Sequence, residues 1–351
     1  MTMPRGANSS SKQPTMWDVA SLAGVSQASV SLVLNGGGRG RVSDATRERI
    51  MDAVRELDYR TNAFAKSLRS GESGLIGFIS DEVASAPFAG RLLKGAQELA
   101  WETGHVILSV DSFGDDALEK AAIDMMRSYR VRGVVYGSMY HRVVRLPAAL
   151  QDIPAVVLNA READGAVPSF FPDEELGGYT ATRHLLDAGH TRIAMINIQP
   201  PESDLPAGIG RMAGYRRALD EAGVEFDQRL VRHGGGVVED GLALTRDLME
   251  GPVVPTAIFC GNDRTAWGAY RALESLGLQV PDNCSIVGFD DQETLAPYLD
   301  PGLTTVALPF EQMARSALES LLGARSEKTD NHPIECSLIP RGSVASAKVH
   351  E

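Results

Sequence analysis

The first apolar positions of the chain recur at a helical spacing. Between Thr15 and Tyr59 they repeat about every 3.6 residues in three short segments, which predicts three short amphipathic helices. Thr15 and Asp18 have the spacing of an N-terminal capping pair for the first helix. Ser26 and Ser43 stand where the second and third helices would begin, and a serine there can accept a hydrogen bond from an unpaired backbone N–H.

A glycine joins the first two of these helices. Gly24, in the stretch "AGVS", permits a tight turn, and two short helices around such a turn have the geometry of a helix-turn-helix. The apolar residues expected to form the small core are Val19, Ala20, Leu22, Ala23, Val30, Val33, Leu34, Ile50, Val54 and Leu57. Helices this short bury little surface, so we interpret them as a binding module and not as the edge of a larger core.

The pattern changes at Leu75. Before it, "RTNAFAKSLRSGESG" predicts a short polar helix that serves as a hinge. After it, amphipathic stretches alternate with the continuously apolar runs "LIGFIS", "VILSV", "GVVYG", "PAVVLN", "RIAMINI", "TAIFCGN" and "SIVGFDD". Such runs are typical of parallel strands buried on both faces. They form two series, which predicts an α/β core made of two doubly wound parallel-sheet lobes.

Polar residues follow several of these strands. They are Ser80, Asp81, Asn159, Asn262, Asp263, Asp290 and Asp291. Ligands of doubly wound sheets bind beyond the carboxyl ends of the strands, so each of these side chains is a candidate contact for a hydroxylated ligand. Each is equally a candidate cap for the helix that follows, and the pattern leaves both roles open.

Composition agrees with a soluble protein of two or three folding units. Of the 351 residues, 43% are hydrophobic and 23% charged, and no apolar run approaches the roughly 20 residues of a membrane helix. Residues 1–14 are polar and small, and no secretory segment follows them, which predicts a disordered arm and a cytoplasmic protein. Cys260, Cys284 and Cys336 are widely spaced in apolar contexts, which predicts buried free thiols.

The formal charge of −12 is unevenly distributed. Residues 1–70 hold 10 Lys and Arg against 6 Asp and Glu, a net +4, while the remainder holds 24 against 40, a net −16. A basic head on an acidic body suggests that only the head meets a polyanion.

Catalytic and metal chemistry has little support. "GIGRMAG" has glycines but neither the spacing nor the preceding strand of a dinucleotide fingerprint. The histidines show no metal-ligand spacing, and no serine stands in a nucleophile elbow. We therefore expect no enzyme activity, no cofactor and no metal.

Three motifs resemble the lactose/galactose repressor family of bacterial transcription regulators. They are "DVASLAGVSQASVSLVLN", "VSDATRERIMDAVRELDYRTNAFAKSLRSG" and the pair "GNDRTAWGA" and "VGFDD". The resemblance spans about residues 15–342 and implies a helix-turn-helix headpiece (15–60), a hinge helix and linker (61–73) and a core similar to periplasmic sugar-binding proteins (74–345). It implies an N-terminal lobe of about 74–172 and 305–331, a C-terminal lobe of about 173–304 and 332–345, and a tail (346–351).

For DNA binding, the resemblance implies a second headpiece helix in the major groove, with Gln27, Ala28 and Ser29 toward the bases. Gln pairs with adenine and alanine touches a thymine methyl. The full expected DNA-contact set is Thr15, Ser26, Gln27, Ala28, Ser29, Ser31, Asn35, Asn62, Ala65 and Leu68. Leu68 is assigned to the minor-groove wedge of the hinge. Leu32 stands where many relatives carry Arg, so the operator sequence should differ from theirs.

For the core, the resemblance implies an effector site formed by Arg211, Asn262, Asp290 and Phe310. Asn159 and Asp81 are expected to complete it from the N-terminal lobe. A guanidinium, an amide, a carboxylate and an aromatic wall suit a sugar or sugar derivative.

The hypothesis is a homodimeric, ligand-responsive repressor of a carbohydrate-utilisation operon that reads a pseudo-palindromic operator. The alternative is a two-lobed solute-binding receptor without a regulatory role, which would have no use for a basic helical headpiece.

Overall fold

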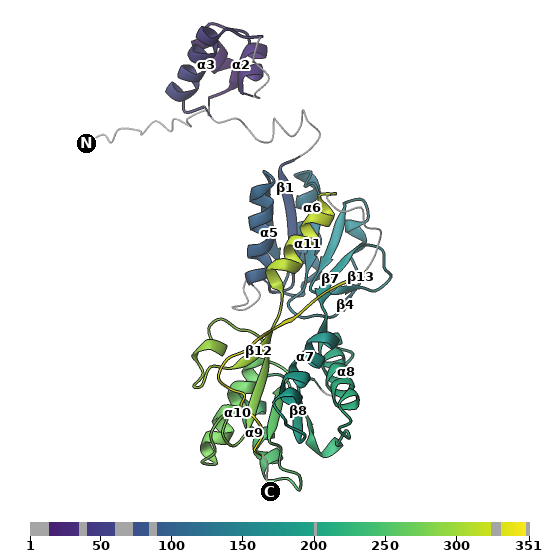
Figure 1. The fold of residues 1–351 in the computed structure, drawn as a ribbon. Helices are drawn as coiled ribbons and strands as arrows, with labels where there is room; N and C mark the ends of the chain where they lie inside the picture. The colour runs from purple at the N-terminus through teal and green to yellow at the C-terminus, as the bar shows by residue number, and fades with distance from the viewer. Residues whose placement is uncertain are drawn as a thin grey trace, which may run out of the picture. The chain divides into compact units, whose positions relative to one another are not determined.

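The computed structural model describes residues 14–34, 41–59, 73–83, 90–199, 202–323 and 331–348. The chain divides into two compact units, Met1–Gly74 and Leu75–Glu351. We refer to them as the headpiece and the core (Figure 1).

The headpiece contains α1 (Met16–Ala23), α2 (Gln27–Leu34) and α3 (Asp44–Glu56). All three predicted helix starts are confirmed. Thr15 and Asp18 form a capping box, with the Asp18 carboxylate 2.7 Å from the Thr15 backbone N. The backbone N–H groups of Ser29 and Thr46 donate to the hydroxyls of Ser26 and Ser43.

Gly24 ends α1 in the left-handed region, with φ +64°, so the turn needs a residue that adopts this conformation without strain. The helices enclose a core whose buried members are Val19, Ala20, Ala23, Val30, Val33, Ile50 and Ala53, all of them expected except Ala53. Leu22 is instead exposed.

No single helix among the described residues is long and apolar enough to cross a membrane. The bent pair of α1 and α2 passes such a test together by length and composition, with a 105° bend between them. Both helices pack against α3, so their apolar residues are used within the headpiece.

The core contains two six-stranded sheets, as the two series of apolar runs predict. The first has the order β13 (Asn331–Ile334), β7 (Ser169–Pro172), β5 (Ala155–Leu158), β3 (Val134–Gly137), β1 (Leu75–Ser80), β2 (Val106–Asp111). The second has the order β14 (Ser337–Ile339), β12 (Thr304–Ala307), β11 (Ser285–Asp290), β10 (Ala257–Cys260), β8 (Ile193–Asn197), β9 (Val231–His233). All pairings within these sheets are parallel except that of β12 with β14. A small sheet pairs β4 (Val143–Val144) with β6 (Arg161–Glu162).

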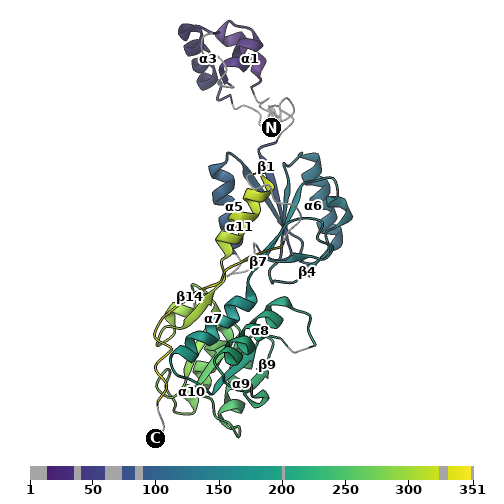
Figure 2. The same ribbon diagram turned by 45° about the vertical axis from the view of Figure 1, so that its right-hand side comes forward.

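Helices cover both faces of each sheet. In the N-terminal lobe, α5 (Gly90–Glu102) and α11 (Phe310–Leu321) pack together, and α6 (Asp116–Ser128) lies on the opposite side of the sheet (Figure 2). In the C-terminal lobe, α7 (Glu174–Asp187) packs on α8 (Pro206–Glu221), and α9 (Val238–Met249) packs on α10 (Asp263–Ser275).

The chain passes between the lobes three times. The first crossing follows β7, as expected, but the other two lie later than the expected boundaries. Thr304–Ala307 pairs with β11 and so belongs to the C-terminal lobe, while Asn331–Ile334 pairs with β7 and belongs to the N-terminal lobe. The second crossing therefore lies between β12 and α11, and the third lies between β13 and β14. Each segment is assigned to the lobe whose strands it pairs with.

Candidate functional site

The first turn of α2 carries the side chains expected to read DNA. Gln27 and Ala28 are exposed there, and Ser29 is half-buried. The hydroxyls of Ser26 and Ser29 lie 3.0 Å apart, so Ser26 holds the start of the helix while Gln27 and Ala28 face solvent.

The remaining expected DNA contacts divide into two groups. Thr15 is exposed and its hydroxyl donates to Asp18 at 2.6 Å, and Ser31 is half-buried on α2, as is Leu32, which was not an expected contact. The others lie outside the described residues; they are Asn35, Asn62, Ala65 and Leu68.

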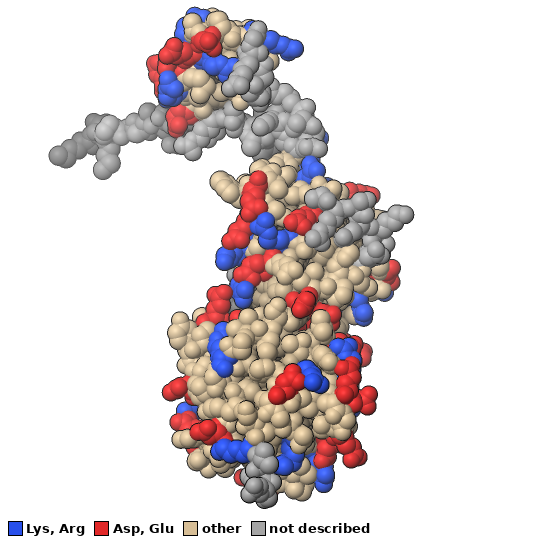
Figure 3. All heavy atoms as spheres, viewed as in Figure 1, with Lys and Arg blue, Asp and Glu red and all other residues tan. Residues whose placement is uncertain are grey.

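The basic excess of the head is not carried by its three helices. Residues 14–34 and 41–59 hold 4 Arg against 6 Asp and Glu. Both signs stand side by side on the headpiece face in Figure 3. The other six basic residues of the first 70 lie outside the described residues; they are Arg5, Lys12, Arg39, Arg60, Lys66 and Arg69. The basic excess of the first 70 residues therefore lies outside the described residues.

In the core, the carboxyl ends of strands from both sheets meet at a cavity between the lobes. Five of the six expected effector residues line it: Asn159, Arg211, Asn262, Asp290 and Phe310. The cavity volume is about 50 Å³. That volume holds a few water molecules and no sugar, so an effector must part the lobes or displace side chains.

Asp81 is the exception. It is not among the residues that line this cavity, because its carboxylate supports a loop of the N-terminal lobe. It accepts hydrogen bonds from the backbone N of Met139 at 2.8 Å, the Ser138 hydroxyl at 3.2 Å and Arg142 Nη2 at 2.7 Å. Asn159 (φ +54°) helps from the other side, since its amide donates to the carbonyls of Ser138 and Met139. Asp81 thus positions the segment that follows β3.

Arg211 is the centre of a buried charge cluster. Its side chain is 4% exposed; Nε donates to Glu174 Oε2 at 2.8 Å, and Nη1 donates to the Gly261 carbonyl and lies 3.7 Å from Asp290 Oδ1. The guanidinium also stacks on Phe289, 3.7 Å from the ring centroid. Burial acts to lower the pKa of Arg211, but Glu174 and Asp290 outweigh it, so the pKa is raised.

Glu174 and His141 belong to this cluster, and sequence reasoning missed both. Glu174 begins α7 beside its cap, Asp173, where an acidic residue ordinarily complements the helix dipole. Burial acts to raise the pKa of the Glu174 carboxyl, but Arg211 and His141 outweigh it and lower that pKa. His141 Nδ1 lies 3.4 Å from Glu174 Oε1, and the ring stacks on Phe171 at 4.7 Å.

The neighbouring strand-end residues have structural partners. Asn262 caps α10, accepting from the backbone N of Thr265 at 2.8 Å and donating to the Gly236 carbonyl at 2.9 Å. Asp263 is fully buried and accepts from the Thr305 hydroxyl at 2.6 Å and the backbone N of Gln292 at 2.7 Å. Burial, with the nearby Asp290 charge, raises the pKa of Asp263 well above its usual range.

Asp290 and Phe310 complete the cavity. Burial raises the pKa of Asp290 to about 6, although the Arg211 charge acts to lower it. The backbone of Asp290 lies at φ +108°, where residues other than glycine are uncommon. Phe310 is 3% exposed at the start of α11, where it forms an apolar wall.

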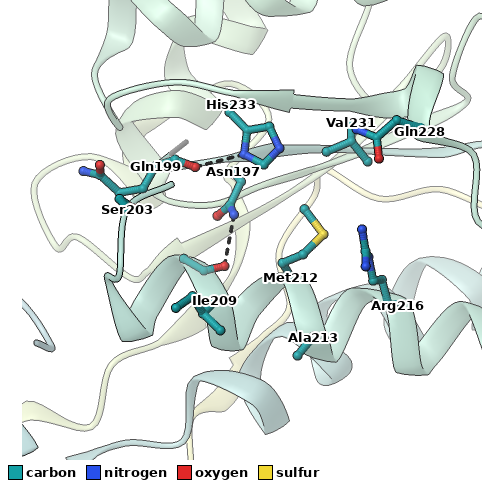
Figure 4. A pocket seen from close by; sticks show the side chains of 11 residues that line it. Asn197, Gln199, Ser203, Ile209, Met212, Ala213, Arg216, Gln228, Val231 and His233 are labelled. Atoms are coloured by element: carbon teal, nitrogen blue, oxygen red, sulfur yellow. Dashed lines mark hydrogen bonds between the residues drawn. The ribbon is translucent and has the colours of Figure 1, made fainter. Parts of the chain in front are cut away.

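A larger pocket, of about 540 Å³, lies within the C-terminal lobe alone, between α8 and β9 (Figure 4). Met212 and Arg216 point into it from α8, and His233 and Gln228 face them. It contains none of the expected effector residues. We take the interlobe cavity as the candidate site because Glu174 from α7, Arg211 from α8 and Asp290 from the end of β11 converge there.

Two family models match the chain. One, for bacterial regulatory proteins of the lacI family, matches residues 15–62, and one for periplasmic binding protein-like domains matches residues 182–344.

Whole-length relatives are similar to the chain. It is 32% identical to the ribose operon repressor of Escherichia coli (strain K12) over 318 residues, 90% of this chain and 94% of that protein. It is 33% identical to the transcriptional regulator DegA of Bacillus subtilis (strain 168), over 90% of this chain and 93% of that protein.

Among solved structures, the lac repressor dimer bound to operator and the anti-inducer ONPF superposes with a TM-score of 0.78 at 27% identity, covering 95% of this chain and 100% of that one. The transcriptional regulator CelR in complex with cellobiose superposes with a TM-score of 0.62 at 29% identity, covering 94% and 99%.

Proposed function

Because the chain belongs to the lacI family of bacterial regulatory proteins, we propose that it represses transcription of a carbohydrate-utilisation operon and responds to a sugar-type effector. The observation that carries this proposal is the joining of two parts in one chain. A helix-turn-helix exposes Gln27 and Ala28 at the start of its second helix, and a two-lobed core gathers Arg211 and Asp290 at an interlobe cavity.

In the DNA complex, α2 lies in the major groove with its first turn toward the base edges. Gln27 hydrogen-bonds an adenine and Ala28 contacts a thymine methyl. Ser29 and Ser31 position the helix on the backbone, while Thr15 and Ser26 fix the helix starts. Leu68 and its neighbours in the hinge contact the minor groove.

The effector acts by binding both lobes and changing their relative pose. A useful switch needs a difference in binding free energy between the two poses of about 1–3 kcal/mol. The protein performs no reaction on its effector: the polar groups at the cavity form ion pairs and helix caps, an arrangement suited to binding.

The protein acts as a homodimer. Two tryptophans of the core are exposed, Trp101 (80%) on α5 and Trp267 (42%) on α10. Val106 (55%) and Tyr298 (80%) are also exposed. Helices α5 and α10 lie on the same side of the core in both views (Figures 1 and 2), so one partner can cover both. Two headpieces related by a twofold axis then read a pseudo-palindrome.

The test is selection of bound duplexes from a random DNA library, followed by fluorescence anisotropy with the selected sequence. We expect a pseudo-palindrome, nanomolar binding by the full chain and none after deletion of residues 1–70. A chain that selects no sequence, while its core still binds sugars, would instead be a two-lobed solute receptor.

A further inference from the structure

The charged side chains at the interlobe cavity balance one another. Two carboxylates, Glu174 and Asp290, face two guanidinium groups, Arg211 and Arg264. Glu174 and Arg211 are each about 4% exposed, so their charges have lost most of their contact with water. A charged group added to such a set leaves one buried charge without a counter-charge, which is strongly unfavourable.

The guanidinium that would hold an acidic ligand is already engaged. A carboxylate or phosphate binds arginine best through two parallel hydrogen bonds. Arg211 directs Nε to Glu174 and Nη1 to the Gly261 carbonyl, and its face covers Phe289. The chain thus supplies its own anion at the position that an anionic ligand would take.

His141 offers the cavity a different kind of contact. The residue is 7% exposed, its ring stacks on Phe171, and its Nδ1 faces Glu174 at 3.4 Å. Among the described residues, Nε2 of His141 has no hydrogen-bond partner although it is buried. With the proton on Nδ1, toward the carboxylate, Nε2 accepts a hydrogen bond. A ligand hydroxyl is the natural donor.

We propose that Glu174 and His141 select an uncharged, polyhydroxylated effector and exclude its acidic or phosphorylated counterparts. Glu174 acts by neutralising Arg211 and by repelling anions, and His141 acts by accepting from a hydroxyl. This inference rests on the proposed effector site and names its ligand class.

Inorganic phosphate is the probe. Full-length protein is titrated with phosphate at constant ionic strength and constant pH, and thermal unfolding is followed. We expect no phosphate-specific stabilisation of the wild-type core. The Glu174→Gln variant leaves the Arg211 charge without this partner. Phosphate should therefore raise the unfolding temperature of this variant, with an apparent phosphate affinity on the order of tenfold higher than that of the wild type. Glu175→Gln is the matched control, since Glu175 is adjacent but exposed and pairs with Arg217.

Two results of this titration overturn the proposal. In the first, phosphate stabilises the wild-type protein, and this stabilisation disappears in Arg211→Gln. This result does not depend on whether a Glu174 variant folds. The other is a folded Glu174→Gln variant that phosphate affects no more than it affects Glu175→Gln.

A second measurement uses matched sugars and their phosphate esters in the operator-anisotropy assay. Only neutral members should change operator affinity, and His141→Phe should reduce the size of that change. An effect seen only with the esters also overturns the proposal. Failure to bind any DNA would instead refute the proposed function, and the phosphate titration would still report on the cavity.

Discussion

Replacing Asp290 by asparagine should make the stability of the core less sensitive to pH. The pKa of Asp290 is raised from 3.8 to about 6, chiefly by burial. In the unfolded chain the carboxyl ionises near 3.8, whereas the folded core retains the proton until about pH 6. Stability from this group is therefore complete below the unfolded pKa and is lost as the pH rises through the folded one.

The size of the effect follows from the two pKa values. Asparagine keeps the shape of the side chain and stays uncharged, so the variant lacks this loss. The free energy of unfolding of Asp290→Asn, relative to wild type, should grow by about 1.4 kcal/mol between pH 5 and pH 8. Nearly all of this growth should be complete by pH 7.

Urea denaturation followed by far-UV circular dichroism at pH 5, 6, 7 and 8 measures this difference. Leu318→Ala is a control, because it removes a fully buried, non-titrating side chain and should shift stability by a similar amount at every pH. A difference between Asp290→Asn and wild type that stays constant from pH 5 to pH 8 would refute the reasoning.

Three further variants, and one control, test other parts of the molecule. Thr15→Ala removes a capping box, so it should destabilise the headpiece by about 1 kcal/mol and weaken operator binding, with the core transition unchanged in calorimetry. Gly178→Ala should unfold the C-terminal lobe or lower its free energy of unfolding by several kcal/mol, because the new Cβ would lie 2.4 Å from the Arg211 carbonyl oxygen. Gly90→Ala, with no atom within 4 Å of its Cβ, should leave thermal stability nearly unchanged. Leu68→Ala should weaken specific operator binding and spare effector binding; equal affinities in a gel-shift titration would count against the wedge.

The sequence by itself determined the local features of this protein. Thr15, Ser26 and Ser43 act on backbone groups within three residues, so capping chemistry predicted all three helix starts. Continuous apolar runs predicted the main buried strands, because a strand buried on both faces needs apolar residues at successive positions. Short edge strands such as β9 and β14 carry little apolar signal and were not predicted.

The sequence predicted the net charge of the first 70 residues but not which segments carry the basic side chains. Counting residues 1–70 predicted a basic head, yet the described helices there hold more acidic than basic side chains. A sequence sum does not say which segment of a module carries its charge.

Only the tertiary structure decided how the cavity works. Glu174 and Arg211 are 37 residues apart in the chain and meet because α7 packs on α8, while His141 comes from the other lobe. Asp81 stands at a strand end, as Asp290 does, but it holds a loop, because the Met139 backbone N–H and the Arg142 side chain donate hydrogen bonds to its carboxylate. Capping and strand burial are local and leave a pattern in the chain. Ion pairing across a cleft depends on which distant elements pack together. Such packing leaves no local pattern in the sequence, so these ion pairs could not be predicted from it.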